Sequence, residues 1–86
     1  MNIVISAHTI LRAQERGASY DEIVSTIDNG INIAAKNDRL AKSKVFNFDS
    51  YRNGKYYQHK KLEVYYTIED GNIITVTVYV FYGVFL

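Results

Sequence analysis

The spacing of apolar residues changes part-way along the chain, and this change predicts helices first and strands afterwards. Apolar side chains recur at helical spacing within about residues 7–16 and again within about 19–29. Each stretch starts after a serine that can cap a helix and stops at a glycine. The second also carries a glutamate placed for a capping box. The residues that mark these ends are Ser6 and Gly17 for the first helix, and Ser19, Glu22 and Gly30 for the second.

Beyond the second helix the period becomes two, which predicts strands joined by tight turns. Asn53-Gly54 and Glu69–Asn72 are strong turn signals between apolar runs. The polar segment 36–42 is predicted to be a loop. The predicted strands cover about 44–49, 55–59, 62–68 and 73–81, with 31–35 as a further short strand or extended lead-in.

This order of elements predicts the fold class. Consecutive hairpins form an antiparallel sheet, and two helices joined by a residue or two must turn sharply onto one side of it. We therefore expect an α+β fold in which two N-terminal helices pack on one face of a twisted antiparallel sheet of about four strands. The length of 86 residues allows one domain, so we expect residues 1–86 to form a single domain.

Composition excludes several classes of protein. The chain has no cysteine, so it has neither disulfides nor thiolate metal sites. The two histidines, His8 and His59, do not have metal-ligand spacing, so no metal or other cofactor is predicted. No apolar run is long enough to cross a bilayer, and no signal peptide is recognised at the start. We therefore expect no membrane segment.

The net charge is only +1, but the charges are unevenly distributed. Residues 36–61 hold eight Lys and Arg against two acids. Such a block is typical of a phosphate-binding face, with Lys60 and Lys61 as candidate ligands, and also of a solvated edge strand protected by lysine. Seven of the eight tyrosines lie from residue 51 onward. They suit stacking on unpaired bases, a protein interface or an ordinary sheet face.

Two sets of polar residues are candidates for catalysis. His8, Arg12 and Arg16 are spaced four apart, so they line one side of the first helix. An imidazole can move protons near neutral pH, and a guanidinium group can hold a phosphate. Thr75, Thr77 and Tyr79 alternate with Val and Ile on the last strand and are predicted to share its polar face. An ordinary solvated surface also accounts for both sets and, from their spacing alone, is favoured over catalysis.

The segments Ser6–Ile23, Leu62–Tyr66 and Ile73–Tyr79 resemble the DUF4258 family, which opens with a His-bearing helix and closes with a Thr-Val-Tyr hairpin. That family resembles the RelE/ParE-like and barnase–EndoU–colicin–RelE (BECR) ribonucleases. These include toxins of toxin–antitoxin pairs and the C-terminal toxin domains of contact-dependent growth inhibition proteins. In this chain Tyr20 replaces the acidic residue that usually follows the serine.

The resemblance implies a metal-independent ribonuclease that cleaves RNA, and tRNA first of all, by attack of the 2′-hydroxyl. His8 would be the general acid or base, Arg12 would hold the scissile phosphate, and Arg16 would support it. Thr77 and Tyr79 would complete the site, with Thr75 nearby. Implied partners are RNA, a cognate immunity or antitoxin protein, and elongation factor Tu. The toxin would act in the bacterial cytoplasm, delivered from a secreted or cell-surface parent.

A second function remains open, which is a non-catalytic protein-binding module. An antitoxin, immunity or adaptor protein would use the Tyr-rich sheet to hold its partner. The apolar tail 80–86 favours this alternative, because such a tail needs a cover.

Overall fold

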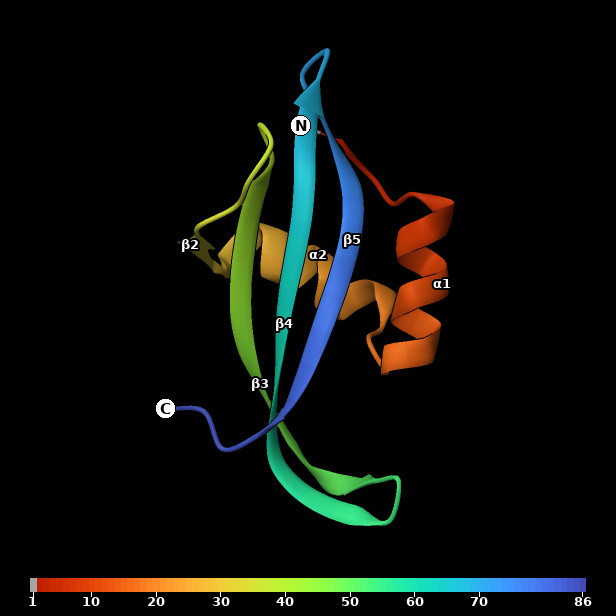
Figure 1. The fold of residues 1–86 in the computed structure, drawn as a ribbon, viewed down its shortest axis with the longest axis vertical. Coiled ribbons are helices and arrows are strands. Elements are labelled where there is room, and N and C mark those ends of the chain that lie inside the picture. The colour runs from red at the N-terminus through yellow and green to blue at the C-terminus, as the bar shows by residue number, and fades with distance from the viewer. Residues whose placement is uncertain (1) are drawn as a thin grey trace.

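The structure is a computed structural model that describes residues 2–86. Two helices lie against a single layer of five strands (Figure 1). In chain order the elements are β1 (Ile3–Val4), α1 (Ala7–Arg16), α2 (Tyr20–Asn29), β2 (Ile31–Ile33), β3 (Leu40–Arg52), β4 (Lys55–Glu69) and β5 (Asn72–Gly83).

Both helices begin and end where the sequence predicts. The Ser6 side chain accepts a hydrogen bond from the Thr9 amide, and Gly17 ends α1 in the left-handed conformation at φ 86°. Ser19 and Glu22 form the predicted capping box at the start of α2. These caps satisfy backbone groups that would otherwise lack partners at the helix ends.

The sheet has five strands in the order β1-β5-β4-β3-β2, and it is mixed rather than wholly antiparallel. The predicted antiparallel strands are present, and the α+β class is confirmed. The additional strand is β1, which runs parallel to β5 and places Ile3 opposite Ile73. Two residues are too few to show an alternating pattern, so the sequence gives no signal for β1.

The central hairpin is longer than the sequence predicts. β4 is one continuous strand, although its sequence suggested two strands on either side of Lys60-Lys61. Lys60 points into the interior, where Glu22 neutralises its charge at 2.8 Å, so the strand needs no break there. β3 begins at Leu40, within the predicted loop, because residues 40–42 pair with β4.

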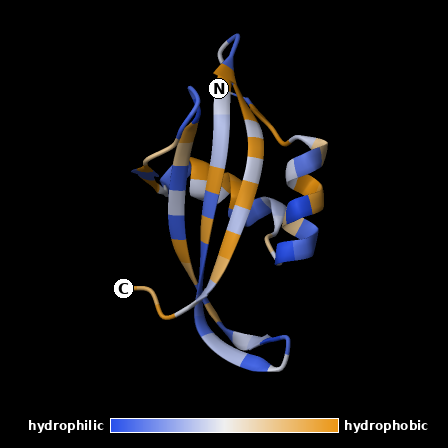
Figure 2. Ribbon diagram, in the orientation of Figure 1, coloured by the Kyte–Doolittle hydropathy of each residue, from blue (hydrophilic) through white to orange (hydrophobic). Residues whose placement is uncertain are grey.

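The hydrophobic core lies between the helices and one face of the central strands. Figure 2 shows the strands as alternating hydrophobic and hydrophilic bands, as expected for a sheet with one covered face. α2 crosses behind β3 and β4, whereas α1 lies alongside β5 (Figure 1). The buried core residues are Ala13, Ile23, Ile27, Leu62, Val64 and Val78.

A β-bulge in β5 changes which residues share a face. Tyr65 pairs with Thr77 and Tyr66 pairs with Thr75, which leaves Val76 as an extra residue in β5. An extra residue reverses the alternation on either side of it. The prediction that Thr75 and Thr77 share a polar face is therefore wrong, because Thr75 is 2% exposed on the core side.

Candidate active site

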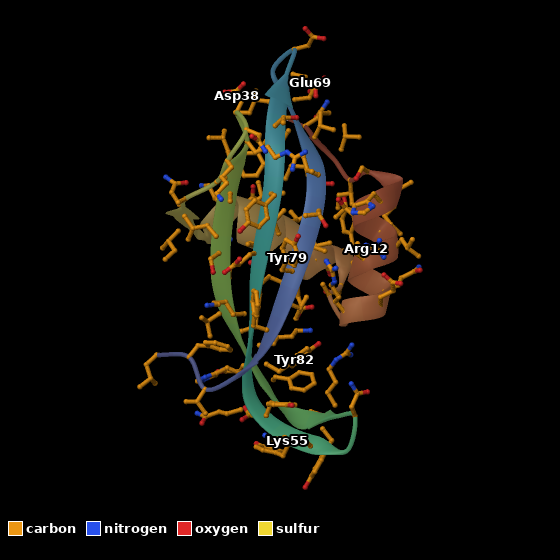
Figure 3. The ribbon with its side chains drawn as sticks, viewed as in Figure 1. Arg12, Asp38, Lys55, Glu69, Tyr79 and Tyr82 are labelled. Atoms are coloured by element: carbon orange, nitrogen blue, oxygen red, sulfur yellow. The ribbon has the colours of Figure 1, made fainter. Side chains whose placement is uncertain are left out.

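A polar cleft lies between α1 and β5, and we call it the α1–β5 cleft. It is an open cavity of about 530 Å³. Figure 3 shows Arg12 on the helical wall and Tyr79 on the strand wall. Five of the predicted site residues meet here although the two walls are far apart in sequence. The lining residues are His8, Arg12, Arg16, Arg39, Val76, Thr77 and Tyr79.

Arg16 connects the two walls of the cleft. Its guanidinium group donates a 2.7 Å hydrogen bond to the carbonyl oxygen of Val78 on β5. The same group lies 4.8 Å from the centre of the Tyr79 ring, in cation–π geometry. Arg16 therefore holds α1 against the strand and contacts the ring of Tyr79, and it also lines the cleft, where a guanidinium group can bind an anion.

Arg12 is more weakly held than Arg16. Its only ion pair among residues 2–86 joins it to Glu15 at 2.6 Å, and the two side chains are 34% and 51% exposed. An exposed pair of this kind is worth about 0–1 kcal/mol. A phosphate that enters the cleft can compete with Glu15 for Arg12. His8, one turn earlier, is exposed and reaches solvent from the same wall.

Arg39 is a cleft residue that the sequence analysis did not single out. It follows Asn37 and Asp38, which both have left-handed φ angles, of 59° and 60°. Its amide donates a 3.2 Å hydrogen bond to the carbonyl oxygen of Lys36, which closes the turn before β3. The only sequence feature that pointed to Arg39 was its place in the basic block of residues 36–61. Nothing local indicates that this turn reaches β5.

Thr75 and Lys60 lie outside the cleft, contrary to their prediction as substrate ligands. The Thr75 hydroxyl accepts a 3.0 Å hydrogen bond from the amide of Ser6, the residue that caps α1. Lys60 is buried and donates a 2.7 Å hydrogen bond to the carbonyl oxygen of Gly17. Their observed contacts position the helix, one at each end.

Lys61 is also absent from the cleft. It lies on the sheet face away from α2, where its ammonium group is 5.5 Å from the centre of the Phe81 ring and 4.8 Å from that of Phe85. The amide of Phe85 donates a 3.0 Å hydrogen bond to Nδ1 of His59, so the C-terminal tail folds back across the sheet. His59 lies within β4 and is 9% exposed.

The C-terminal end of α1 is held by one side chain from each long strand. Arg52 of β3 donates to the carbonyl oxygen of Glu15 at 2.9 Å, and Tyr82 of β5 donates to that of Arg16 at 2.7 Å. Lys60 of β4 donates to the next carbonyl oxygen along the chain. We call these three the helix-end contacts. They satisfy carbonyl groups at a helix terminus and fix the helical wall of the cleft.

The two tyrosines beside the cleft are locked against each other. The Tyr65 and Tyr79 rings pack edge to face, with centroids 5.7 Å apart. The Tyr65 hydroxyl donates a 3.1 Å hydrogen bond to Glu63. Burial, followed by this hydrogen bond, raises the pKa of the Tyr65 phenol above its usual value, so the phenol stays protonated at neutral pH.

The comparison with protein families matches residues 5–80 to the profile described as "Domain of unknown function (DUF4258)". The chain belongs to the DUF4258 family. The matched region of this DUF4258 chain includes all of α1 and most of β5, hence both walls of the cleft. No curated protein and no solved structure matches the chain significantly.

Residues 2–86 also bear on metal binding and membrane insertion. No group of three or more His, Asp or Glu side chains in this part of the chain is arranged to hold a metal ion. No helix among the same residues is long and apolar enough to cross a membrane.

Proposed function

We propose that this DUF4258 chain is an endoribonuclease that cleaves RNA, with tRNA as the first substrate to test. One observation carries the proposal, which is that a single cleft collects one imidazole, His8, and three guanidinium groups. Arginine can grip a phosphate through two parallel hydrogen bonds, and histidine can exchange protons near neutral pH. Together they supply the two functions that cleavage of a phosphodiester requires.

The reaction would be an internal transesterification. The ribose 2′-oxygen attacks the adjacent phosphorus and gives its proton to a general base or to water, while the bond from phosphorus to the 5′-oxygen of the next nucleotide breaks and that oxygen takes up a proton from a general acid or from water. The products are a 2′,3′-cyclic phosphate and a 5′-hydroxyl end. His8 serves as the general acid or base, and Arg12 and Arg16 stabilise the charge on the phosphoryl oxygens. Thr77 and Tyr79 position the nucleotide from β5.

The proposed ribonuclease activity extends to a proposed biological role as a toxin. The resemblance of the DUF4258 family to RelE/ParE-like and BECR ribonuclease toxins supports this extension, although likeness to a family does not by itself define activity. We propose a toxin of this kind, which acts in the bacterial cytoplasm, is neutralised by an immunity or antitoxin protein, and belongs to a toxin–antitoxin or contact-dependent growth inhibition system. Elongation factor Tu is a further proposed partner.

The test is cleavage of purified tRNA by the parent protein, His8→Ala and Gln14→Ala. Gln14 is exposed on α1 and does not line the α1–β5 cleft, so it is the matched control. We expect His8→Ala to lose at least about 100-fold in cleavage rate, which is a typical contribution of general acid–base catalysis. Mapping of the product ends checks the chemistry. Equal rates for His8→Ala and parent would remove His8 from the mechanism.

A second candidate function, a protein-binding module, is favoured by a different groove. The β2 edge and the C-terminal tail border a cavity of about 620 Å³, and Ile31 beside it is 70% exposed. Apolar side chains exposed along a groove are typical of a protein interface. Expression without a partner separates the two functions, because a toxin stops growth when produced alone and a binding module is tolerated.

A further inference from the structure

A second cavity adjoins the α1–β5 cleft on the open face of the sheet, and we call it the Tyr65 cavity. Its volume is about 360 Å³, within the range of roughly 300–1,000 Å³ that small-molecule pockets occupy. The turn before β3 forms one wall and the paired strands β4 and β5 form the other. Its lining residues are Ala34, Ala35, Lys36, Asn37, Arg39, Tyr65, Thr77 and Tyr79.

The two cavities are neighbours. Arg39, Thr77 and Tyr79 line both of them, so a ligand in one lies beside residues that also line the other. The two cavities differ in the chemical groups that line them. The α1–β5 cleft offers guanidinium groups and an imidazole, whereas the Tyr65 cavity adds alanine methyl groups, an aromatic ring and the amide of Asn37.

The chemistry of the Tyr65 cavity suits a flat, uncharged heterocycle. The Tyr65 hydroxyl donates its hydrogen bond to Glu63, so Tyr65 offers a ligand its ring and an acceptor oxygen but no donor. Unstacked bases are bound by aromatic rings and by polar groups that hydrogen-bond their edges. Asn37 offers both a donor and an acceptor for such an edge. Lys36 and Arg39 can meet the backbone phosphates on either side.

We propose that the Tyr65 cavity binds the nucleobase adjacent to the phosphate held in the α1–β5 cleft. This inference rests on the proposed ribonuclease function and deepens it, because it specifies single-stranded RNA as the substrate class. A base in a duplex is paired and stacked, so it enters a side cavity only at the cost of unpairing and unstacking, which an unpaired base does not bear. The enzyme would therefore act on loops and unpaired ends, such as those of tRNA.

The test uses binding of RNA that cannot be cleaved. A fluorescent, fully 2′-O-methylated hexanucleotide lacks the attacking hydroxyl, and an abasic version keeps only the sugar–phosphate backbone. We expect the parent protein to bind the base-containing strand at least about fivefold more tightly than the abasic one, which corresponds to one stacked base. The same strand in a duplex should show no such gain over the abasic strand.

Two alanine-to-leucine variants place the preference in this cavity. Ala35→Leu fills the cavity, so it should bind both strands with the affinity of the parent for the abasic strand. Ala7→Leu is the matched control, because Ala7 is exposed on α1 and lines neither cavity, and it should keep the full preference. A parent protein without a preference for bases, or an Ala35→Leu variant that retains it, would overturn the inference.

Cleavage assays separate this inference from the proposed function. If the parent cleaves tRNA and Ala35→Leu cleaves it equally well with an unchanged site preference, the base-binding role fails and the ribonuclease stands. If the parent prefers bases and Ala35→Leu loses that preference, yet no protein cleaves any RNA, the catalytic proposal fails and a nucleotide-binding cavity remains.

Discussion

The hydroxyl of Tyr82 donates a 2.7 Å hydrogen bond to the carbonyl oxygen of Arg16, a residue 66 positions earlier in the chain. This bond joins the last turn of α1 to the end of β5. Arg16 also donates to β5 through its side chain, so the same residue is held by both its backbone and its guanidinium group. The position of the helical wall thus depends on contacts with β5 rather than on hydrogen bonds within α1.

At Gly17 the end of α1 packs so closely against β3 and β5 that a side chain has no room. A Cβ atom at Gly17 would collide with the Tyr82 hydroxyl and the Arg52 guanidinium group. Its φ of 86° also disfavours any other residue by about 1–2 kcal/mol. We expect Gly17→Ala to lower the free energy of unfolding by more than that amount, because the collision adds to the backbone cost. Urea denaturation measures the change.

Gly71 provides the control for Gly17→Ala. It also has a positive φ, of 76°, but nothing lies within 4 Å of the position that its Cβ would occupy. Gly71→Ala should therefore show the backbone cost alone. Equal losses for the two variants would mean that Tyr82 and Arg52 yield freely to a side chain at residue 17.

The buried ammonium group of Lys60 is expected to contribute strongly to stability. It bonds to both Glu22 and the Gly17 carbonyl oxygen, and its side chain is only 9% exposed. Lys60→Met keeps an unbranched side chain of similar length but removes both bonds. We therefore expect the free energy of unfolding to fall by about 2–3 kcal/mol. Lys61→Met, next in sequence but on the opposite face, loses only cation–π contacts with Phe81 and Phe85, so it should cost less than Lys60→Met, about 1 kcal/mol. Thermal and urea denaturation compare the two.

Arg12 and Arg16 should separate activity from stability. Arg12→Ala removes only an exposed ion pair, so we expect stability to change by less than about 1 kcal/mol. Its RNA cleavage should still fall about 100-fold, because charge stabilisation at the phosphate is lost. Arg16→Ala loses its bond to Val78 as well, so it should destabilise the fold and lower cleavage together. Unchanged cleavage by Arg12→Ala would exclude that residue as the phosphate ligand.

The raised pKa values of the partly buried tyrosines predict that stability falls at alkaline pH. Burial is the largest cause that raises the pKa values of Tyr65 and Tyr82 above the ordinary value of 10.0. The folded state therefore holds these protons more tightly than the unfolded state. The resulting stability is complete below pH 10 and is lost as the pH rises through the folded pKa values. Urea midpoints measured on both sides of pH 10 should fall on the alkaline side.

Tyr82→Phe is the variant that checks this dependence. It lacks the bond to Arg16, so it should be less stable than the parent at neutral pH by about 0.5–1.5 kcal/mol. It also lacks one of the phenols whose pKa is raised in the folded state, so its stability should fall less steeply above pH 10. A decline as steep as that of the parent would contradict the assignment to Tyr82.

The parts of the fold that could be predicted from sequence are those with local causes. Ser6, Gly17 and the Ser19–Glu22 pair act within one turn of the chain, and both helices have the predicted bounds. The alternation along β5 likewise predicts a strand. The parallel strand β1 depends on backbone pairing with Ile73, 70 residues away, which no local pattern records.

The same distinction between local and long-range causes holds for the candidate site. The four-residue spacing of His8, Arg12 and Arg16 predicts their shared side of α1, and the cleft contains all three. Thr75 was misplaced because the bulge at Val76 follows from the pairing with β4 rather than from the sequence of β5. Lys60 appeared to be a surface cation, since its partner Glu22 lies on a different element.

The helix-end contacts have a consequence for the energetics of ligand binding. Arg52, Lys60 and Tyr82 each come from a different strand of one meander, and all three fix the same turn of α1. The width of the cleft is therefore set by folding, before any ligand arrives. A ligand pays little conformational entropy to order these walls, so more of its contact energy remains as affinity.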